Sequence, residues 1–369
     1  TMEYNQRGHH LYQMLAMNAE TGKLRTVVEE RANTFVNYGR LWRQFIKDGK
    51  QLLWMSERDN WNHLYLYDVQ KSKVIRQITK GDWFVRGIQR VDEEKGEIYF
   101  SASGVNKNED PYLVHYYKIG IDGKNMVALT PEEGNHSAQY TYDYRYLLDT
   151  YSKVDAAPVT VLRDAQTGKL VKTLETADIA TLKKHGWVAP EVFVAKGRDG
   201  KTDMWGIIQR PTNFDPNKKY PVIEYIYSGP GDVYTPKSFM PYNWYTTSLA
   251  ELGFIVVQLD AMGTSYRGKK FEEVCYKNLK DAGFPDRELW IKAAAKKYPY
   301  MDADNVAIYG CSAGGQESTT AVLLHGDFYK AAYSACGCHD NRMDKIWWNE
   351  QWMSWPIDSS YVECSNVEN

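Results

Sequence analysis

The sequence predicts an all-β half followed by an α/β half. In the first half, runs of alternating hydrophobic residues recur on either side of short polar turns, which is typical of half-buried strands. In the second half, nearly continuous apolar runs are separated by helical stretches, which indicates a doubly wound parallel or mixed sheet. The composition shifts after Leu174, so we expect one domain over 1–174 and another over 175–369.

Composition and charge exclude several classes of protein. The chain is 43% hydrophobic and 25% charged, which is typical of a folded globular protein. Its formal net charge is −2, so a nucleic-acid partner is not expected. No apolar run is long enough to predict a membrane span, and Thr1–His10 shows no signal-peptide pattern. Five cysteines are too few for a disulfide scaffold of this length.

A repeated hairpin pattern specifies the first half further. Lys23, Lys73, Lys124 and Lys169 each end a polar turn between two alternating runs, at intervals of 50, 51 and 45 residues. Repeats of about 40 to 50 residues that consist of strands are typical of β-propeller blades. About four blades are therefore predicted, as part of a ring, with an unrelated regular meander as the alternative. The hairpins are expected at Leu11–Glu29, Leu64–Thr79, Tyr112–Thr130 and Val159–Thr176.

The second half contains the elements of an α/β sheet in order. A hairpin is expected around Gly197–Gly200, and Asp286 is expected to cap a helix that runs to about Lys297 with Leu289 on its apolar face. The remaining buried strands are expected at Tyr220–Tyr227, Phe254–Leu259, Val306–Tyr309 and Ala331–Ala335.

The motif Gly310-Cys311-Ser312-Ala313-Gly314 lies between a predicted strand and the predicted helix Gln316–His325. Gly-x-Ser-x-Gly in this context is the nucleophile elbow, in which glycines relieve crowding across a tight turn. The helix N-terminus then places backbone N–H groups where an oxyanion would form. The alternative is a Gly-rich turn with a structural serine.

Over most of its length, the sequence resembles the dipeptidyl peptidase IV-like serine peptidases of the prolyl oligopeptidase group, which join a β-propeller to a C-terminal α/β-hydrolase domain. The resemblance implies that Ser312 is the acylated nucleophile. It also implies that the Tyr227 hydroxyl and the Ala313 N–H form the oxyanion hole. It rests on Lys219–Pro221, Tyr227–Pro230, Asp260–Gly268, Asn305–Gly315 and Glu350–Met353 with Pro356.

The sequence departs from the family pattern beside the serine. Cys311 and Ala313 stand where the best-known members carry Trp and Tyr, and Met262 replaces an arginine. The sequence therefore does not predict a proline preference. The residues expected to line the substrate pocket are Trp347, Trp348, Trp352 and His339.

Only 57 residues follow Ser312. In α/β-hydrolases the catalytic acid and then the histidine come after the nucleophile. The family motifs for both do not occur here, so we expect a fragment with a C-terminally truncated hydrolase domain that is itself inactive. His339 is expected to line the pocket or bond its loop rather than to be the base. Cys336-Gly337-Cys338-His339 matches no usual zinc spacing, so buried thiols, no metal and no cofactor are expected.

The sequence thus predicts a serine peptidase of the dipeptidyl-peptidase type, which acts on peptides through an acyl-enzyme. Two alternatives stay open. One is an esterase or acyl-peptide hydrolase, and the other is a non-catalytic propeller binding module with a decayed hydrolase domain. The resemblance implies a periplasmic or extracellular location and leaves homodimerisation open.

Overall fold

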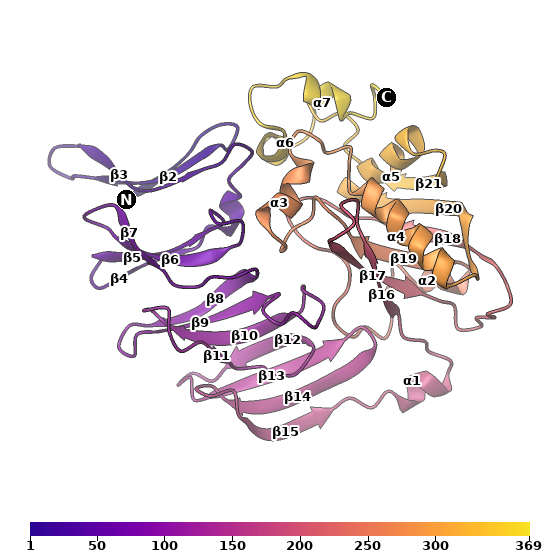
Figure 1. Ribbon diagram of the computed structural model, residues 1–369, viewed down its shortest axis with the longest axis horizontal. Helices are drawn as coiled ribbons and strands as arrows, with labels where there is room; N and C mark the ends of the chain where they lie inside the picture. The colour runs from indigo at the N-terminus through magenta and orange to yellow at the C-terminus, as the bar shows by residue number, and fades with distance from the viewer.

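The computed structural model describes residues 1–369 as five sheets along the chain (Figure 1). The first four are small antiparallel sheets of three or four strands, which lie side by side in chain order. The fifth has six strands and carries the larger helices. No helix combines the length and the apolar character needed to cross a bilayer.

Four blade-like sheets form the first half, as the repeat predicts. Each of the predicted hairpins is the last strand pair of its sheet. The sheets are β1 (Met2–Asn5), β2 (Leu11–Met17) and β3 (Leu24–Arg31); β4 (Arg43–Ile46), β5 (Gln51–Ser56), β6 (His63–Asp68) and β7 (Lys73–Gln77); β8 (Phe84–Asp92), β9 (Glu97–Ser103), β10 (Val114–Gly120) and β11 (Val127–Ala128); and β12 (Asn135–Tyr140), β13 (Tyr146–Lys153), β14 (Ala156–Asp164) and β15 (Leu170–Thr176).

Adjacent blades are held together by the side chains between them. Met14 of the first sheet packs with Trp54 and Tyr65 of the second in one buried cluster. Leu53 of the second sheet shares a further cluster with Phe100 of the third. Because each blade buries a face of its neighbour, the alternating pattern in the sequence follows from the stacking. The strand β15 extends to Thr176, two residues past the expected end of this domain.

The second half is a mixed six-stranded sheet in the order β16-β17-β19-β18-β20-β21. The strand β18 pairs in parallel with both β19 and β20, and β20 pairs in parallel with β21. Its strands are β16 (Glu191–Lys196), β17 (Asp203–Gln209), β18 (Tyr220–Tyr225), β19 (Ile255–Asp260), β20 (Met301–Cys311) and β21 (Tyr329–Ala335). The helices of the chain are η1 (Tyr38–Arg40), α1 (Ala180–Lys184), α2 (Thr247–Glu251), α3 (Lys269–Glu272), η2 (Glu273–Cys275), α4 (Phe284–Lys297), α5 (Ala313–Leu324), α6 (Ile346–Met353) and α7 (Ser359–Glu363).

The prediction for the start of α4 was wrong. The residue before the helix is Gly283, with φ 74°, and it receives no side-chain cap. Asp286 instead lies buried in the first turn, where it accepts hydrogen bonds from the Arg198 backbone N–H at 2.7 Å and from its guanidinium. The helix buries Trp290 and Ile291 in the main core, whereas Leu289 is exposed.

The first two blades contact the second half through buried charges. Arg40 of η1 donates hydrogen bonds to both oxygens of Glu272 in α3, at 2.8 and 3.0 Å. It also forms a 3.0 Å ion pair with Glu57 in its own half. The side chain of Glu272 is 3% exposed, and that of Arg40 is 10% exposed. A buried ion pair therefore joins the two halves. Each charged group has lost most of its contact with water and is stabilised by the opposite charge of the other.

Replacing Arg40 tests how much the ion pair with Glu272 contributes to stability. Arg40→Ala leaves Glu272 buried without its cation, so we expect a loss of about 3 to 5 kcal/mol in the free energy of unfolding. The measurement is urea denaturation, with Lys23→Ala on an exposed hairpin turn as the control. A loss for Arg40→Ala no larger than the control's would contradict the importance of this ion pair.

Candidate active site

Ser312 lies at a strained turn between β20 and α5. Its φ of 59° and ψ of −120° fall in a region that non-glycine residues rarely adopt. Its backbone N–H donates a hydrogen bond to the Ala335 carbonyl at 2.9 Å. The side chain is exposed and makes no capping hydrogen bond to the helix. The geometry of this turn therefore presents the hydroxyl at the surface, as the motif predicts.

The glycines of the motif are required by close backbone contacts. A Cβ atom on Gly310 would lie 2.4 Å from the Ile226 carbonyl oxygen, and one on Gly314 would lie 2.1 Å from the same atom. A Cβ on Gly315 would lie 2.2 Å from the Ala335 carbonyl oxygen. Any side chain at these positions would push β18 or β21 away from the turn.

Tyr227 follows the end of β18 and lines the same cavity as Ser312 and Ala313. Its ring packs against that of Tyr234, with 4.4 Å between the centroids. Ala313 is the first residue of α5, so its N–H has no acceptor within the helix. A serine hydroxyl, a phenol and a free backbone N–H are thus gathered around one space, and such groups can attack a carbonyl and bind the resulting oxyanion.

The shared cavity has a volume of about 470 Å³. Trp347, Trp348 and His339 line it, together with Cys336, Gly337, Cys338, Asp340, Met343, Asp344, Lys345 and Gln316. Trp352 does not line it, so that prediction was wrong. Trp352 is 2% exposed and packs edge-on against Phe35 of the propeller half, 4.8 Å between centroids.

His339 lines the cavity but makes no hydrogen bond to the Ser312 hydroxyl. Its Nδ1 atom lies 3.1 Å from the Asn366 side-chain nitrogen, which ties the imidazole to the C-terminal segment. The neighbouring Asp340 carboxylate is bonded by Arg342 at 2.7 and 2.8 Å. This pairing holds the pKa of Asp340 below its ordinary value. Both residues are thus engaged in holding their own loop.

The thiols differ from the expectation that they are buried. Cys336 is exposed and Cys338 is half-buried. The Cys338 thiol donates a hydrogen bond to the Asp340 carbonyl at 3.2 Å, and burial raises its pKa. No group of three or more His, Cys, Asp or Glu side chains has an arrangement that could hold a metal ion.

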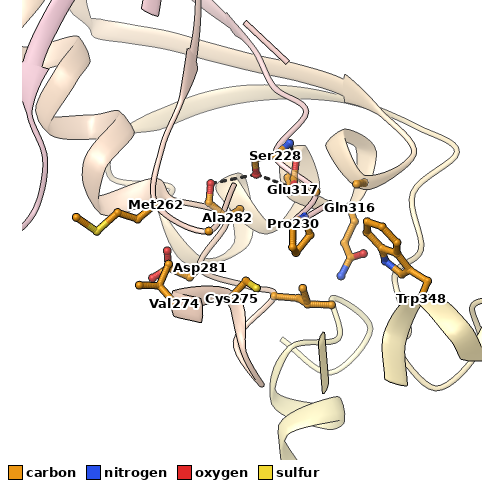
Figure 2. A pocket seen from close by; sticks show the side chains of 14 residues that line it. Ser228, Pro230, Met262, Val274, Cys275, Asp281, Ala282, Gln316, Glu317 and Trp348 are labelled. Carbon is orange, nitrogen blue, oxygen red and sulfur yellow. Dashed lines mark hydrogen bonds between the residues drawn. The ribbon is translucent and has the colours of Figure 1, made fainter. Parts of the chain in front are cut away.

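A second, small cavity of about 20 Å³ shares Ala313 with the first and is bordered by Ser228, Ala282 and Glu317 (Figure 2). Glu317 is 6% exposed; its carboxyl accepts a hydrogen bond from the Ser228 N–H at 3.0 Å and is hydrogen-bonded to the Ser228 hydroxyl at 2.8 Å. Sequence reasoning missed this residue. Its only signal was an acidic side chain in a helix of otherwise small or neutral residues.

Comparisons with known proteins match both halves of the chain. Residues 1–158 match the family model described as "Dipeptidyl peptidase IV (DPP IV) N-terminal region", and residues 240–369 match "Prolyl oligopeptidase family". Dipeptidyl peptidase 4 of Trichophyton rubrum is 29% identical over 308 residues, 81% of this chain and 38% of that protein. Dipeptidyl peptidase 4 of Arthroderma otae is 27% identical over 306 residues, again 81% of this chain and 38% of that protein. The chain thus spans well under half the length of these curated relatives.

Two solved structures share the fold. That of Porphyromonas gingivalis dipeptidyl peptidase 4 superposes with a TM-score of 0.84 and 24% identity, and the match covers 99% of this chain and 51% of that one. A candidate dipeptidyl aminopeptidase IV of Bacteroides ovatus gives a TM-score of 0.86 with 26% identity, and the match covers 99% of this chain and 54% of that one. Both superpositions support the predicted blades followed by a hydrolase domain.

The tight packing of Gly314, in the turn that contains Ser312, can be tested by comparing it with Gly231, a glycine in open space. Gly314→Ala would place a Cβ 2.1 Å from a backbone oxygen, whereas a Cβ on Gly231 would have no other atom within 4 Å. We expect Gly314→Ala to lower the free energy of unfolding by about 3 kcal/mol or more, and Gly231→Ala to change it by less than about 1 kcal/mol. Urea denaturation of both variants measures the difference, and equal effects would show that the contact at Gly314 is not tight.

Proposed function

We propose, from the matches of both halves to the dipeptidyl peptidase IV-like proteins of the prolyl oligopeptidase family, that the protein is a serine peptidase that releases dipeptides. The observation that carries the proposal is the exposed Ser312 hydroxyl, which shares one cavity with Tyr227 and with the first residue of α5. The similarity of both halves to dipeptidyl peptidase relatives supports a peptide as the substrate.

The proposed chemistry is acyl transfer in two steps. The Ser312 oxygen attacks the scissile carbonyl carbon, its proton goes to a base, and the carbonyl oxygen becomes an oxyanion. The Tyr227 hydroxyl and the Ala313 N–H donate hydrogen bonds to that oxyanion. Its collapse breaks the C–N bond, and the proton passes to the leaving amine. Water then attacks the acyl-enzyme by the same sequence of steps and regenerates the serine.

We assign the base and its acid to residues outside these 369. Supporting this, the imidazole in the cavity, His339, is tied to Asn366, and Asp340 is neutralised by Arg342. A serine hydroxyl without a base is a poor nucleophile at neutral pH.

An esterase or acyl-peptide hydrolase is the second candidate. It is favoured by the small Ala313 side chain and by the charged residues Asp344 and Lys345 in the cavity wall, which form an ion pair at 2.8 Å. A proline ring gains little from such a wall. Comparing the hydrolysis of a Pro-containing dipeptide amide with that of a simple acyl ester separates the two candidates.

The location and the oligomeric state stay predictions. We propose export to the periplasm or the extracellular space, on the family resemblance alone. The five cysteines are all unpaired, and neither their number nor their state selects a compartment. Homodimerisation is likewise a prediction from the family resemblance.

Covalent labelling tests the proposed nucleophile. In the full-length protein, with any residues that follow Asn369 in its gene, we expect a fluorophosphonate probe to label Ser312, as identified by peptide mass mapping. Ser312→Ala should abolish labelling, and Tyr227→Phe should slow it by about 10²- to 10³-fold, since one oxyanion donor is lost. Cys311→Ala removes the adjacent exposed thiol and serves as the control. In this variant Ser312 should be labelled at the wild-type rate. Labelling that persists in Ser312→Ala would refute the assignment.

A second prediction concerns these 369 residues on their own. Because no base reaches the Ser312 hydroxyl, we expect them to hydrolyse dipeptide amides at less than about 10⁻³ of the full-length rate, since the residues of a triad act as a unit. The measurement is single-turnover kinetics on both proteins, with circular dichroism to check that both are folded. Comparable rates would mean that a base lies within these residues.

A further inference from the structure

Glu317 and Ser228 form a buried hydrogen-bonded pair close in the chain to Ser312 and Tyr227. Glu317 is on α5, one turn beyond Ser312, and Ser228 follows Tyr227 in the chain. The side chain of Glu317 thus bridges the helix of the nucleophile and the loop of the oxyanion donor (Figure 2). The mechanism above makes no use of either residue.

Tyr227 is fixed on both sides by contacts to the same turn and helix. On its N-terminal side, the Ile226 N–H donates to the Tyr309 carbonyl at 2.9 Å, and the Ile226 carbonyl packs against Gly310 and Gly314. On its C-terminal side, the peptide N–H between Tyr227 and Ser228 donates to Glu317 at 3.0 Å. The position of the Tyr227 ring relative to Ser312 therefore depends on these two attachments.

The hydrogen bonds around Ser228 are compatible with a proton on Glu317. The Ser228 hydroxyl oxygen is 2.8 Å from Glu317 Oε1 and 3.2 Å from the Ala282 carbonyl oxygen. A hydroxyl has only one proton and can donate fully to one of these two acceptors. If Glu317 is protonated, it donates to the Ser228 oxygen, the Ser228 hydroxyl donates to Ala282, and Oε2 still accepts from the Ser228 N–H. This arrangement gives the Ser228 hydroxyl and both Glu317 oxygens a partner, and the Ala282 carbonyl also accepts a hydrogen bond from Arg287 Nε at 2.9 Å.

We propose that Glu317, held in its protonated form, is a positioning residue that fixes the Tyr227 hydroxyl against Ser312 through Ser228. The inference rests on the proposed function, because it concerns the oxyanion donor of that reaction. Glu317 itself does not touch the cavity that contains the reacting atoms.

The surroundings of Glu317 favour the neutral carboxyl. Burial raises its pKa above the ordinary value, against the effects of Ser228 and of Arg287 on α4. Arg287 is itself bonded by Glu224 of β18 at 2.6 Å, so most of its charge is already compensated, and Glu224 repels a second carboxylate. Three other groups face this region, and one of them is the Cys275 thiol, whose pKa is raised by burial. Tyr234 keeps a raised pKa because it is buried, and Asp281 is paired with Arg198 at 2.7 Å.

A protonated buried carboxyl makes stability depend on pH in a defined direction. Because the folded protein holds a proton that the unfolded chain releases above its ordinary pKa of 4.5, the contribution of Glu317 to stability is lost as pH rises through the raised pKa of the folded state. Glu317→Gln reproduces the neutral carboxyl, with its NH₂ donating to Ser228 and its carbonyl accepting. This variant should therefore lack that dependence.

The first test requires no activity. Amide hydrogen exchange is measured on the peptide that contains the Ser228 N–H, in the wild type, Glu317→Gln and Glu317→Ala. We expect Glu317→Ala to exchange at least about 10-fold faster, since a protecting hydrogen bond is lost, and Glu317→Gln to match the wild type at pH 6. Thermal unfolding from pH 5 to 9 should show a steeper loss of Tm with rising pH in the wild type than in Glu317→Gln. Unchanged exchange in Glu317→Ala, or equal pH slopes, would overturn the inference even if the protein is an active peptidase.

The second test separates a positioning role from a merely structural one. Fluorophosphonate labelling rates of the full-length protein are measured for Tyr227→Phe, Glu317→Ala and the double variant, with Glu317→Gln as the rescue. If Glu317 acts through Tyr227, adding Glu317→Ala to Tyr227→Phe should slow labelling by less than about 3-fold, although alone it slows labelling by about 10-fold or more. Additive effects would overturn the positioning role. An unlabelled wild type with the expected exchange pattern would instead refute the peptidase proposal while the Glu317 contact stands.

Discussion

The contact between the Ile226 carbonyl and the two glycines that flank Ser312, Gly310 and Gly314, determines the geometry of the site. The strands β18 and β20 are parallel neighbours, so their carboxyl ends meet at one edge of the sheet. Tyr227 leaves β18 at this edge, and Ser312 leaves β20 there. A Cβ on Gly310 or Gly314 would occupy the space of the Ile226 oxygen, so only glycine lets the turn close against β18. The two side chains that share the cavity are thus brought together by backbone packing.

The propeller half braces one wall of the same cavity through α6. Trp347 and Trp348, on the first turn of this helix, line the cavity, while Glu350 and Trp352 face the first blade. The Glu350 carboxylate accepts a hydrogen bond from the Gly8 N–H at 2.8 Å and is paired with Arg7 at 2.7 Å. Those bonds hold its pKa below the ordinary value despite burial. Trp352 of α6 also packs with Cys275, and its carbonyl accepts a hydrogen bond from the Lys277 N–H at 2.9 Å, so the helix and the pocket wall that it forms depend on both halves.

Features set by local rules could be predicted from the sequence, and features set by tertiary contacts could not. The blade hairpins follow from alternation and turn residues, and the nucleophile turn follows from the glycine spacing between a strand and a helix. Trp352 was misplaced because its spacing relative to Trp348 does not tell which face meets Phe35 of the propeller half. Asp286 resembled a helix cap, yet its partner Arg198 comes from a distant hairpin. The one sequence signal of Glu317, an acidic residue among small or neutral ones, did not indicate its contact, because its partner Ser228 lies 89 residues away in the chain.

The conformation of Ser312 argues against a purely structural serine. Holding a non-glycine residue at φ 59° and ψ −120° costs about 1 to 3 kcal/mol, which other interactions of the fold must offset. A structural serine commonly uses its hydroxyl to bond the backbone, as Ser318 inside α5 does with the Gly314 carbonyl at 2.7 Å. Ser312 makes no such bond, and its hydroxyl is exposed at a cavity where its neighbours leave a phenol and a backbone N–H unpaired. The strain therefore contributes nothing to local stability, and its one evident consequence is to present the Ser312 hydroxyl to this cavity.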